Sequence, residues 1–552
     1  MNYFLGIAFI LIVWFLISNF IKKKRLRAFK TKLFNNWAKE KETTYYNFFV
    51  IGKYFNNNSH KKKAYYILPD KTADDFDLES VFKFLDRTSS KIGQQYLYFK
   101  LRTIGSIKEL LRFNDLTSIF LNDKDFSIKC QLELSKLNHN NVYYFEELIN
   151  GKQLEKPKYL WLIKTLTISG ILSLLFSFYH PAFALLLIPI LATNMVFHYK
   201  NKHSVTYYLN GVNQLSRALK VGKTLGESEK ISNHFKNLNF LNKISKIQFK
   251  TEFIAFEKNV SNEFLFAFWF VFEILKILFN VEYLMFYSFL KSIIKERESL
   301  EKLFLFIGEI DAAISTASLK AGELKICTPN FNDNKTLTVE EINHPLIKNC
   351  VENNVTLAKK SMLLTGSNMS GKTTFIRTVA LNSILAQTFN IAFAKSYNAP
   401  FYKVYSSIRI TDDLLEDTSY YLQEVLTVKE LVDASENQEP CLFVLDEIFK
   451  GTNTIERISG GKAILSYLNK KQHTVLVSTH DIELTELLEK ENYDLYHFSE
   501  QIENNELLFD HKIKKGKLKT RNAIKILDIY NYPKEIIENA KVTETSFFLN
   551  NL

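Results

Sequence analysis

The stretch LLTGSNMSGKTTFIR (residues 363–377) has the spacing of a phosphate-binding loop. Gly366 and Gly371 stand in the pattern G-x-x-x-x-G-K-[ST], and Lys372 and Thr373 complete it. The apolar SMLL before the loop predicts a short buried strand, and TTFIRTVALNSILAQ after it predicts an amphipathic helix. A strand–loop–helix unit directs backbone N–H groups and a helix N-terminus at phosphate. The stretch therefore predicts an α/β nucleotide-binding domain.

Two later apolar runs also end in polar side chains. PCLFVLDE predicts a buried strand from Cys441 to Leu445 that is followed by Asp446 and Glu447. HTVLVSTH predicts another strand, ending in His480, where a polar side chain can sense the γ-phosphate. Open α/β sheets bind ligands at the carboxyl ends of their strands. We therefore expect these side chains to meet the phosphate loop.

This arrangement predicts an ATPase that uses ATP and Mg²⁺. Lys372 is expected to reach the β- and γ-phosphates, and the Thr373 hydroxyl to hold Mg²⁺ together with Asp446. Glu447 is placed to polarise the attacking water. The predicted catalytic residues are thus Glu447, His480 and Lys372.

Length and composition set wider limits. A chain of 552 residues suggests two to four domains. A formal net charge of +12 is compatible with nucleic acid or anionic lipid as a partner, and equally with a chain that is rich in lysine throughout. The four cysteines form no C-x-x-C pair. This spacing favours a reducing compartment, without a disulfide framework or a zinc site.

The N-terminal stretch from Tyr3 to Ile21 carries no charged side chain, and KKKRLR follows it directly. Its length is sufficient to cross the roughly 30 Å hydrocarbon layer as a helix. The positive charge after it places the rest of the chain in the cytoplasm. A cleaved signal peptide is the alternative, but such peptides carry their charge before the apolar run.

A second apolar block runs from Tyr159 to Tyr199, with Lys164 as its only charged residue. FYHP breaks the block in the middle, so we expect two spans of about 19 residues joined at His180 and Pro181. Lysines flank both ends, which places both ends on the cytoplasmic side. The predicted location is the cell membrane, with several spans and a cytoplasmic ATPase domain.

A third apolar stretch, from Phe264 to Leu290, is interrupted by Glu273, Lys276 and Glu282. Charges at the centre of a span are costly in lipid. Glu273 and Lys276 are spaced to pair on one helical face. These features favour a long buried or surface-lying helix over a further span, and both remain open.

The motifs resemble those of the MutS mismatch-repair ATPases, in the order that this family has them. The strongest matches are TGSNMSGKTTFIRTVAL at the loop, LDEIFKGTNTIE (445–456), STHDIELTEL (478–487), ITDDLLEDTSYYLQEV (410–425) and INHPLI (342–347). Weaker matches to the family's helical core and last domain elements are FLDRTSSKIGQQYLYFKL (84–101), EIDAAISTASL (309–319) and the segment 510–540.

The resemblance implies an ABC/MutS-type P-loop NTPase domain, preceded by an α-helical core and lever domain that here carries transmembrane helices. The expected organisation is an anchor at 1–27, a linker at 28–80, the start of the core at 81–158, the hairpin at 159–199, the rest of the core and lever at 200–330, and the ATPase domain at 331–545.

The resemblance also implies a homodimer with composite ATP sites, in which a serine of one subunit completes the site of the other. The matching residue is Ser419, whose alternative role is a helix N-cap. Asn368 would contact the γ-phosphate. The implied nucleotide-binding residues are Gly366, Ser367, Asn368, Met369, Ser370, Gly371, Lys372, Thr373, Thr374 and Ser419.

The chain departs from the family in several places. It has Ser370 where the family usually has glycine, and Phe449 and Lys450 where it has Gly-Arg. An aromatic residue for adenine is expected near residues 350–353 and is missing there, which leaves base selectivity open. The mismatch-reading domain and the C-terminal dimerisation extension are also expected to be absent.

Three functions follow from these features. The first is a membrane-anchored MutS-like ATPase that acts as a dimer and is coupled to DNA binding, on mismatched, branched or damaged DNA. The alternative is a membrane mechano-ATPase that uses dimer closure without nucleic acid. The third, a nucleotide-binding scaffold, has no need of a base at Glu447.

Overall fold

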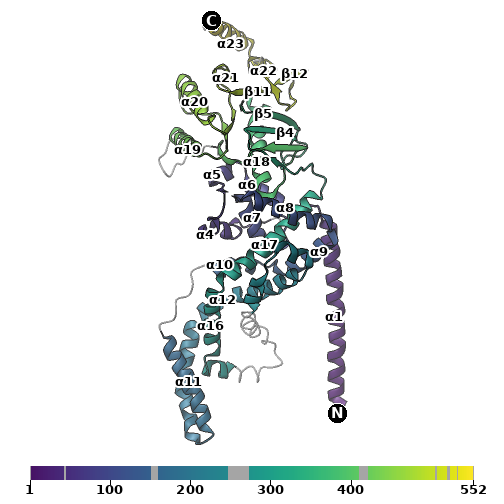
Figure 1. Cartoon of the computed structure of the whole chain (residues 1–552), viewed down its shortest axis with the longest axis vertical. Helices are drawn as coiled ribbons and strands as arrows, with labels where there is room; N and C mark the ends of the chain where they lie inside the picture. Colours follow the sequence, from purple (N-terminus) through teal and green to yellow (C-terminus); the bar gives the residue numbers. More distant parts are fainter. Residues whose placement is uncertain are drawn as a thin grey trace. The chain divides into compact units, whose positions relative to one another are not determined.

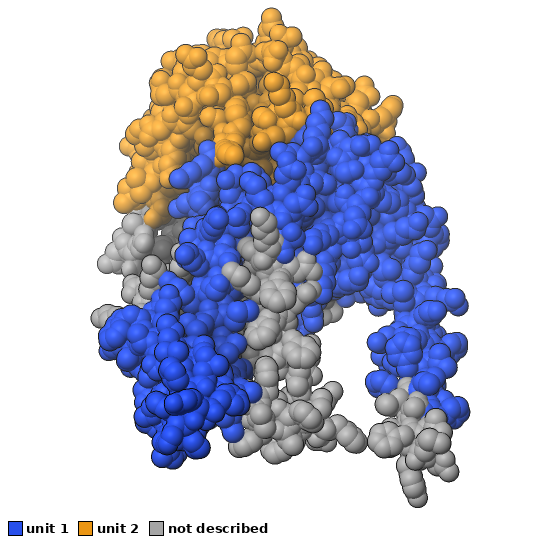
Figure 2. All heavy atoms as spheres, turned by 60° about the horizontal axis from the view of Figure 1, so that its bottom comes forward, with its two compact units in different colours: residues 1–62, 85–99, 112–322 blue, residues 63–84, 100–111, 323–552 orange. Residues whose placement is uncertain are grey.

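The computed structural model describes residues 2–42, 45–150, 159–245, 273–409, 420–503, 506–518, 523–530 and 532–550. The chain forms two compact units (Figure 1, Figure 2). Unit 1 comprises residues 1–62, 85–99 and 112–322, and unit 2 comprises residues 63–84, 100–111 and 323–552. The two units are therefore interleaved in sequence, whereas we expected contiguous domains.

Unit 1 is built from helices around α17 (Arg297–Lys320), which is buried on all sides from Phe306 to Leu319. Its many alanine and serine residues allow neighbouring helices to approach closely. The other helices of unit 1, of which α7 and α8 extend into unit 2, are α1 (Asn2–Asn36), α2 (Phe48–Ile51), α3 (Lys53–Asn56), α4 (Asn58–Lys61), α7 (Lys91–Arg102), α8 (Ile107–Asn122), α9 (Lys124–Leu134), α10 (Tyr144–Asn150), α11 (Leu160–Ser177), α12 (Leu187–Gly226), α13 (Glu229–Phe235) and α16 (Val281–Lys295).

A buried carboxylate joins the two segments that resemble the family's helical core. Asp311 of α17 accepts hydrogen bonds from the backbone N–H groups of Ser89 (2.9 Å) and Ser90 (2.7 Å), just before α7 begins. Burial raises the pKa of Asp311 to about 6. A Cβ atom at Gly93 would lie 2.1 Å from the Asp311 carboxylate, so only glycine fits there.

Residues 28–80 do not form the expected linker. The aromatic-rich segment after α1 folds into α2, α3 and α4, and buries Ile51, Tyr54 and Phe55 in unit 1. These side chains bury enough apolar surface to hold the segment in the core. Residues 63–80 belong to unit 2.

His60, on α4, is expected to make unit 1 more stable at low pH than at high pH. Its Nδ1 lies 2.9 Å from Glu301 Oε1, and its Nε2 lies 3.6 Å from Glu146 Oε1. Burial lowers the pKa of His60, but hydrogen bonds to both glutamates outweigh it and raise this pKa above its ordinary value of 6.5. The stabilisation is therefore complete below about pH 6.5 and is lost as the pH rises through the folded-state pKa.

Thermal unfolding in detergent between pH 6 and pH 9 measures this effect. The unfolding midpoint of the wild type should fall with pH more steeply than that of His60→Gln, which cannot titrate. The difference is expected to be a few degrees at most for a chain of this size. Parallel profiles would contradict the role of His60.

Helices α11 and α12 form a hairpin (Figure 1). They are joined through the 3-10 helix η3 (Pro181–Leu186), which begins at the predicted break. Among the described residues, Leu160–Ser177 and Pro181–Lys200 are long and apolar enough to cross a membrane, with 17% and 6% of their residues buried. Helix α12 continues well beyond Tyr199, to Gly226.

The predicted anchor lies in α1, a continuous helix of 35 residues. Phe9, Trp14 and Phe20 on this helix are 68%, 67% and 69% exposed. Large apolar side chains are this exposed where a partner or a membrane covers them. The anchor stays a prediction.

The third apolar stretch is not one long helix. Its part before residue 273 lies outside the described residues. Residues 273–278 are helical, Asn280 takes a left-handed conformation (φ 48°), and α16 then begins at Val281. Asparagine tolerates this conformation better than most residues. The predicted ion pair of Glu273 and Lys276 is confirmed, at 2.9 Å.

Unit 2 is an α/β structure around a six-stranded sheet with the order β14-β11-β6-β10-β9-β8. All neighbours are parallel except β14, which pairs antiparallel with β11. The central strands are almost fully buried, as expected for a parallel sheet with helices on its faces. The strands are β6 (Ser361–Thr365), β8 (Lys403–Ser407), β9 (Cys441–Asp446), β10 (Thr474–Ser478), β11 (Tyr493–His497) and β14 (Lys514–Lys515).

A second sheet in unit 2 has four strands in the order β3-β7-β4-β5. These are β3 (Asn330–Phe331), β4 (Thr336–Ile342), β5 (Asn353–Ala358) and β7 (Ser396–Ala399). Two short pairs are β1 (Tyr66–Ile67) with β2 (Thr103–Ile104), and β12 (Glu500–Glu503) with β13 (Glu506–Phe509). The helices are α5 (Asp70–Asp75), α6 (Leu78–Leu85), α18 (Lys372–Phe389), α19 (Tyr420–Ser435), α20 (Thr454–Leu468), α21 (Ile482–Glu489), α22 (Ala523–Ile529) and α23 (Lys534–Asn550).

Hydrogen bonds and an ion pair hold the N-terminal segment of unit 2 to the end of β8. The buried Asp75 carboxylate accepts hydrogen bonds from the Ser406 hydroxyl (2.7 Å) and the Arg409 backbone N–H (2.9 Å). Asp77 forms a bidentate pair with the Arg409 guanidinium, at 2.8 and 2.7 Å. Such charge-assisted bonds explain why residues 63–84 fold with the sheet.

Candidate functional site

The phosphate loop leaves β6 and enters α18 with two glycines in conformations that other residues rarely adopt. Gly366 has φ 146° and Gly371 has φ 102°. A Cβ atom on Gly366 would lie 2.8 Å from the Ser370 hydroxyl and 3.0 Å from the Phe498 carbonyl oxygen. Ser370 itself donates a hydrogen bond to the Ser367 carbonyl (2.7 Å). The serine that replaces the family's glycine thus closes the loop.

Lys372 lies inside this loop and is only 2% exposed. Its ammonium donates to the carbonyl oxygens of Gly366 (2.7 Å) and Ser367 (3.0 Å), and lies 3.2 Å from His480 Nε2. Burial lowers the pKa of Lys372 to about 8. An anion in the loop would give this buried cation an acceptor of opposite charge.

Thr373 and Asp446 meet at the carboxyl edge of the sheet. The Thr373 hydroxyl donates to Asp446 Oδ2 at 2.8 Å, and the Ser478 hydroxyl donates to Asp446 Oδ1. A hydroxyl and a carboxylate at this distance can be shared by one Mg²⁺, which prefers oxygen ligands and retains several waters. The residues therefore fit the metal that the loop pattern implies.

Glu447 stands next to this pair in a left-handed conformation (φ 55°), held by a hydrogen bond from its N–H to the Ser478 carbonyl (2.8 Å). Its carboxylate lies 3.0 Å from His480 Nε2 and 3.1 Å from Lys450 Nζ. The hydrogen bond to His480 outweighs burial and lowers the pKa of Glu447 to about 2. Glu447 is therefore ionised at neutral pH and can accept a proton.

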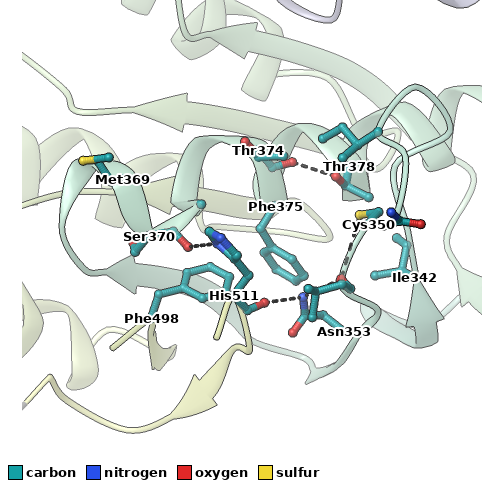
Figure 3. A pocket seen from close by; sticks show the side chains of 14 residues that line it. Ile342, Cys350, Asn353, Met369, Ser370, Thr374, Phe375, Thr378, Phe498 and His511 are labelled. Carbon is teal, nitrogen blue, oxygen red and sulfur yellow. Dashed lines mark hydrogen bonds between the residues drawn. The ribbon is translucent and has the colours of Figure 1, made fainter. Parts of the chain in front are cut away.

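The structure thus brings together five predicted residues from the ends of β6, β9 and β10: Lys372, Thr373, Asp446, Glu447 and His480. The other predicted residues divide into two groups. Thr374 and Met369 both line a cavity beside the loop, and Met369 is 72% exposed (Figure 3). The Asn368 side chain and all of Ser419 lie outside what the structure describes, so their roles stay predictions.

A cavity of about 400 Å³ opens beside the loop (Figure 3). Three rings line it: Phe375 from α18, Phe498 after β11, and His511 before β14. His511 Nδ1 lies 3.0 Å from the Ser370 carbonyl, and the His511 carbonyl accepts a hydrogen bond from Asn353 (3.0 Å). Residues 350–353 contribute no aromatic ring to this cavity, and its rings come from other parts of the chain.

The exposed ring of His511 is expected to stack on the base of a bound nucleotide. His511→Ala should weaken ATP binding about fivefold, because a stacked ring pair contributes about 1 kcal/mol. The affinity for inorganic tripolyphosphate, which has no base, should not change. Equal losses for both ligands, measured by calorimetry, would contradict this role.

Phe449 occupies the position where the family usually has glycine, and its φ of 60° explains that preference. Its backbone N–H donates to the buried Glu424 carboxylate on α19. A Cβ atom on Gly460 would lie 3.1 Å from the Phe449 ring. Phe449 is only 9% exposed, so burial of its ring compensates for the unfavourable backbone.

Comparison with known proteins agrees with this geometry. Residues 362–547, which contain every described residue of the phosphate site, match the family model "MutS domain V". The C-terminal part of the chain is therefore a MutS domain V. The DNA mismatch repair protein MutS of Staphylococcus haemolyticus (strain JCSC1435) is 32% identical over 280 residues, and that of Staphylococcus aureus (strain JH9) is 30% identical over 280 residues.

Each match covers 49% of this chain but only 31% and 32% of the respective MutS protein. The chain thus spans about a third of the length of these relatives. The family model matches the part of this chain that holds the phosphate loop. The residues matched by the family model, 362–547, do not include the hairpin or α1.

Proposed function

We propose that this MutS-family chain binds Mg²⁺–ATP at residues 366–374 and hydrolyses it. The observation that carries the proposal is the contact of Thr373 with Asp446 at 2.8 Å, next to the ionised Glu447. A nucleotide-binding scaffold would need the loop and the metal pair but not a base. MutS-family proteins are ATPases, which supports the same conclusion.

Bound Mg²⁺–ATP would supply the phosphoanhydride bond and a cation that neutralises charge on the phosphates. Lys372 and the first N–H groups of α18 would bind the phosphates, and Thr373 and Asp446 would hold the metal. Glu447 would take the proton of the attacking water, while His480 orients its carboxylate.

We propose a homodimer in which two such sites face each other. Apolar side chains are exposed on the loop and on α19 and α20, among them Met369 (72%), Leu426 (49%) and Ile455 (79%). An exposed apolar surface of this kind marks an interaction site. Ser419, just before α19, is proposed to reach the nucleotide of the partner subunit.

The Ser419→Ala variant tests the contribution across the dimer. Hydrolysis should fall severalfold at protein concentrations that favour the dimer, because one donor to the phosphates is lost. Mixing this variant with Lys372→Ala separates the roles, since one site of the mixed dimer then keeps both Lys372 and the partner's Ser419. Activity that does not recover on mixing would restrict Ser419 to its own chain, as an N-cap of α19.

We propose that the ATPase faces the cytoplasm, held at the cell membrane by the anchor and the hairpin, and acts on DNA. Two observations support a DNA substrate: the related proteins are named DNA mismatch repair proteins, and the net charge of +12 favours a polyanion.

One observation favours the alternative, a mechano-ATPase of the membrane. Helix α12 runs for 40 residues from the hairpin into the helical unit, so it can transmit motion between them.

ATP hydrolysis by the chain in lipid nanodiscs decides between these two functions. Perfect, mismatched and branched duplexes should be compared at low and high salt. Stimulation that weakens steeply with salt indicates phosphate contacts and supports DNA as the substrate. Hydrolysis that ignores DNA but depends on lipid composition supports the mechano-ATPase instead.

A further inference from the structure

We propose that the segment 273–295 enters the bilayer beside the hairpin with its N-terminal part, and that its helix break, at Leu278–Asn280, lies within the hydrocarbon layer. This inference rests on the proposed membrane insertion of α11 and α12. It adds a third membrane element, whose partner is the lipid around it.

The depth of the break follows from its contacts. Phe279 contacts Thr167 of α11, and Leu278 contacts Asn194 of α12. Thr167 lies seven residues after Leu160, and Asn194 six residues before Lys200, which places each about 10 Å inside the cytoplasmic end of its span. A Cβ atom on Gly170, one turn deeper in α11, would lie 3.6 Å from the Leu278 carbonyl oxygen. Both helices therefore place the break inside a layer of about 30 Å.

Two carbonyl groups at the break face polar side chains of the hairpin. Asn194, which is fully buried, donates its side-chain N–H to the Leu278 carbonyl at 2.7 Å. The Thr167 hydroxyl lies 3.3 Å from the Phe279 carbonyl oxygen, and the Asn280 side-chain amide lies 3.4 Å from that hydroxyl. In lipid, no water can bond to backbone groups released from a helix, so side chains of neighbouring helices must do so.

The charges and apolar side chains of the segment agree with this depth. Lys276, whose side chain is 5% exposed, pairs with Glu273 at 2.9 Å, as charges inside a membrane must. Leu275, on the outside, is 43% exposed. From the break, α16 runs beside α12 to Lys295, and α17 begins at Arg297 (Figure 1). The segment therefore connects the membrane with the central helix of unit 1.

Fluorescence quenching in nanodiscs tests the depth. Single cysteines at Leu275, Ile188 and Ile294 are labelled with bimane, with the four native cysteines replaced by alanine. Ile188 is an exposed residue of the hairpin, and Ile294 lies near the cytoplasmic end of α16. Nitroxide groups on lipid acyl chains should quench the labels at Leu275 and Ile188, whereas aqueous iodide should quench the label at Ile294.

The hairpin label separates the two possible failures. If lipid quenches Ile188 but iodide quenches Leu275, the hairpin spans the membrane and the third element is wrong. If iodide quenches both, the proposed hairpin is wrong and this inference fails with it.

A second variant tests the hydrogen bond that holds the break. Asn194→Leu should increase iodide quenching of the Leu275 label severalfold, because the Leu278 carbonyl loses its donor in lipid. Thr193→Val is the matched control, since Thr193 is exposed and its hydroxyl bonds only within its own helix, to the Pro189 carbonyl. Equal quenching in Asn194→Leu and Thr193→Val would contradict the role of Asn194.

Discussion

Lys372→Ala is expected to weaken ATP binding at least a hundredfold. The buried ammonium bonds to loop carbonyls and lies beside His480, so it offers its charge to a phosphate in the loop. A hydrogen bond between charged groups contributes about 1.5–3 kcal/mol. Two such bonds to phosphate oxygens correspond to roughly a hundredfold or more in affinity.

Equilibrium titration with a fluorescent ATP analogue measures this loss. The matched control is Lys429→Ala, which removes an exposed lysine on α19 that pairs with Asp433. The control should bind like the wild type, because a surface pair of this kind contributes little. Tight ATP binding by Lys372→Ala would overturn the assignment of the phosphate loop.

Glu447→Gln is expected to bind ATP normally and to hydrolyse it about a hundred to ten thousand times more slowly, the range that a positioned base contributes. The amide keeps the size of the side chain and can still accept a hydrogen bond from His480. It cannot take a proton from water, whereas the carboxylate, with its pKa of about 2, is ionised and ready to do so.

The slow variant should also accumulate as an ATP-bound dimer, because hydrolysis no longer opens it. Single-turnover hydrolysis and light scattering measure the two effects on the same sample. Glu486→Gln, an exposed glutamate on the nearby α21, is the control and should behave like the wild type. Normal turnover by Glu447→Gln would show that another group serves as the base.

The phosphate site was predictable from sequence because its chemistry depends on local patterns. A glycine pair with a lysine and threonine fixes the loop, and buried parallel strands appear as continuous apolar runs. The adjacency of β6, β10 and β9 then follows from the sheet. The contacts of Thr373 with Asp446 and of Glu447 with His480 are consequences of these neighbours.

The cavity rings were not predictable in the same way. Phe498 and His511 reach the loop from beyond β11, more than a hundred residues after it in sequence. No local pattern marks a ring that approaches from so far away. The interleaving of the units was missed for the same reason. Asp75 holds its segment to the sheet through hydrogen bonds to the end of β8, and no local pattern marks these bonds.

The apolar stretches show a different limit. Composition locates helices α11 and α12, and FYHP locates the turn between them. The break at Asn280 carries no such signal, because asparagine occurs in many contexts and its left-handed conformation is stabilised by tertiary contacts. Sequence therefore identifies the segment but not its two helices.

The most direct test of the account is ATP hydrolysis by the full chain in lipid nanodiscs, titrated with Mg²⁺. We predict hydrolysis that requires Mg²⁺ and is lost in both Lys372→Ala and Glu447→Gln, with ATP binding retained only in the latter. Hydrolysis that persists in both variants, or that proceeds without Mg²⁺, would contradict the assignment of this site as the ATPase centre of a MutS-family protein.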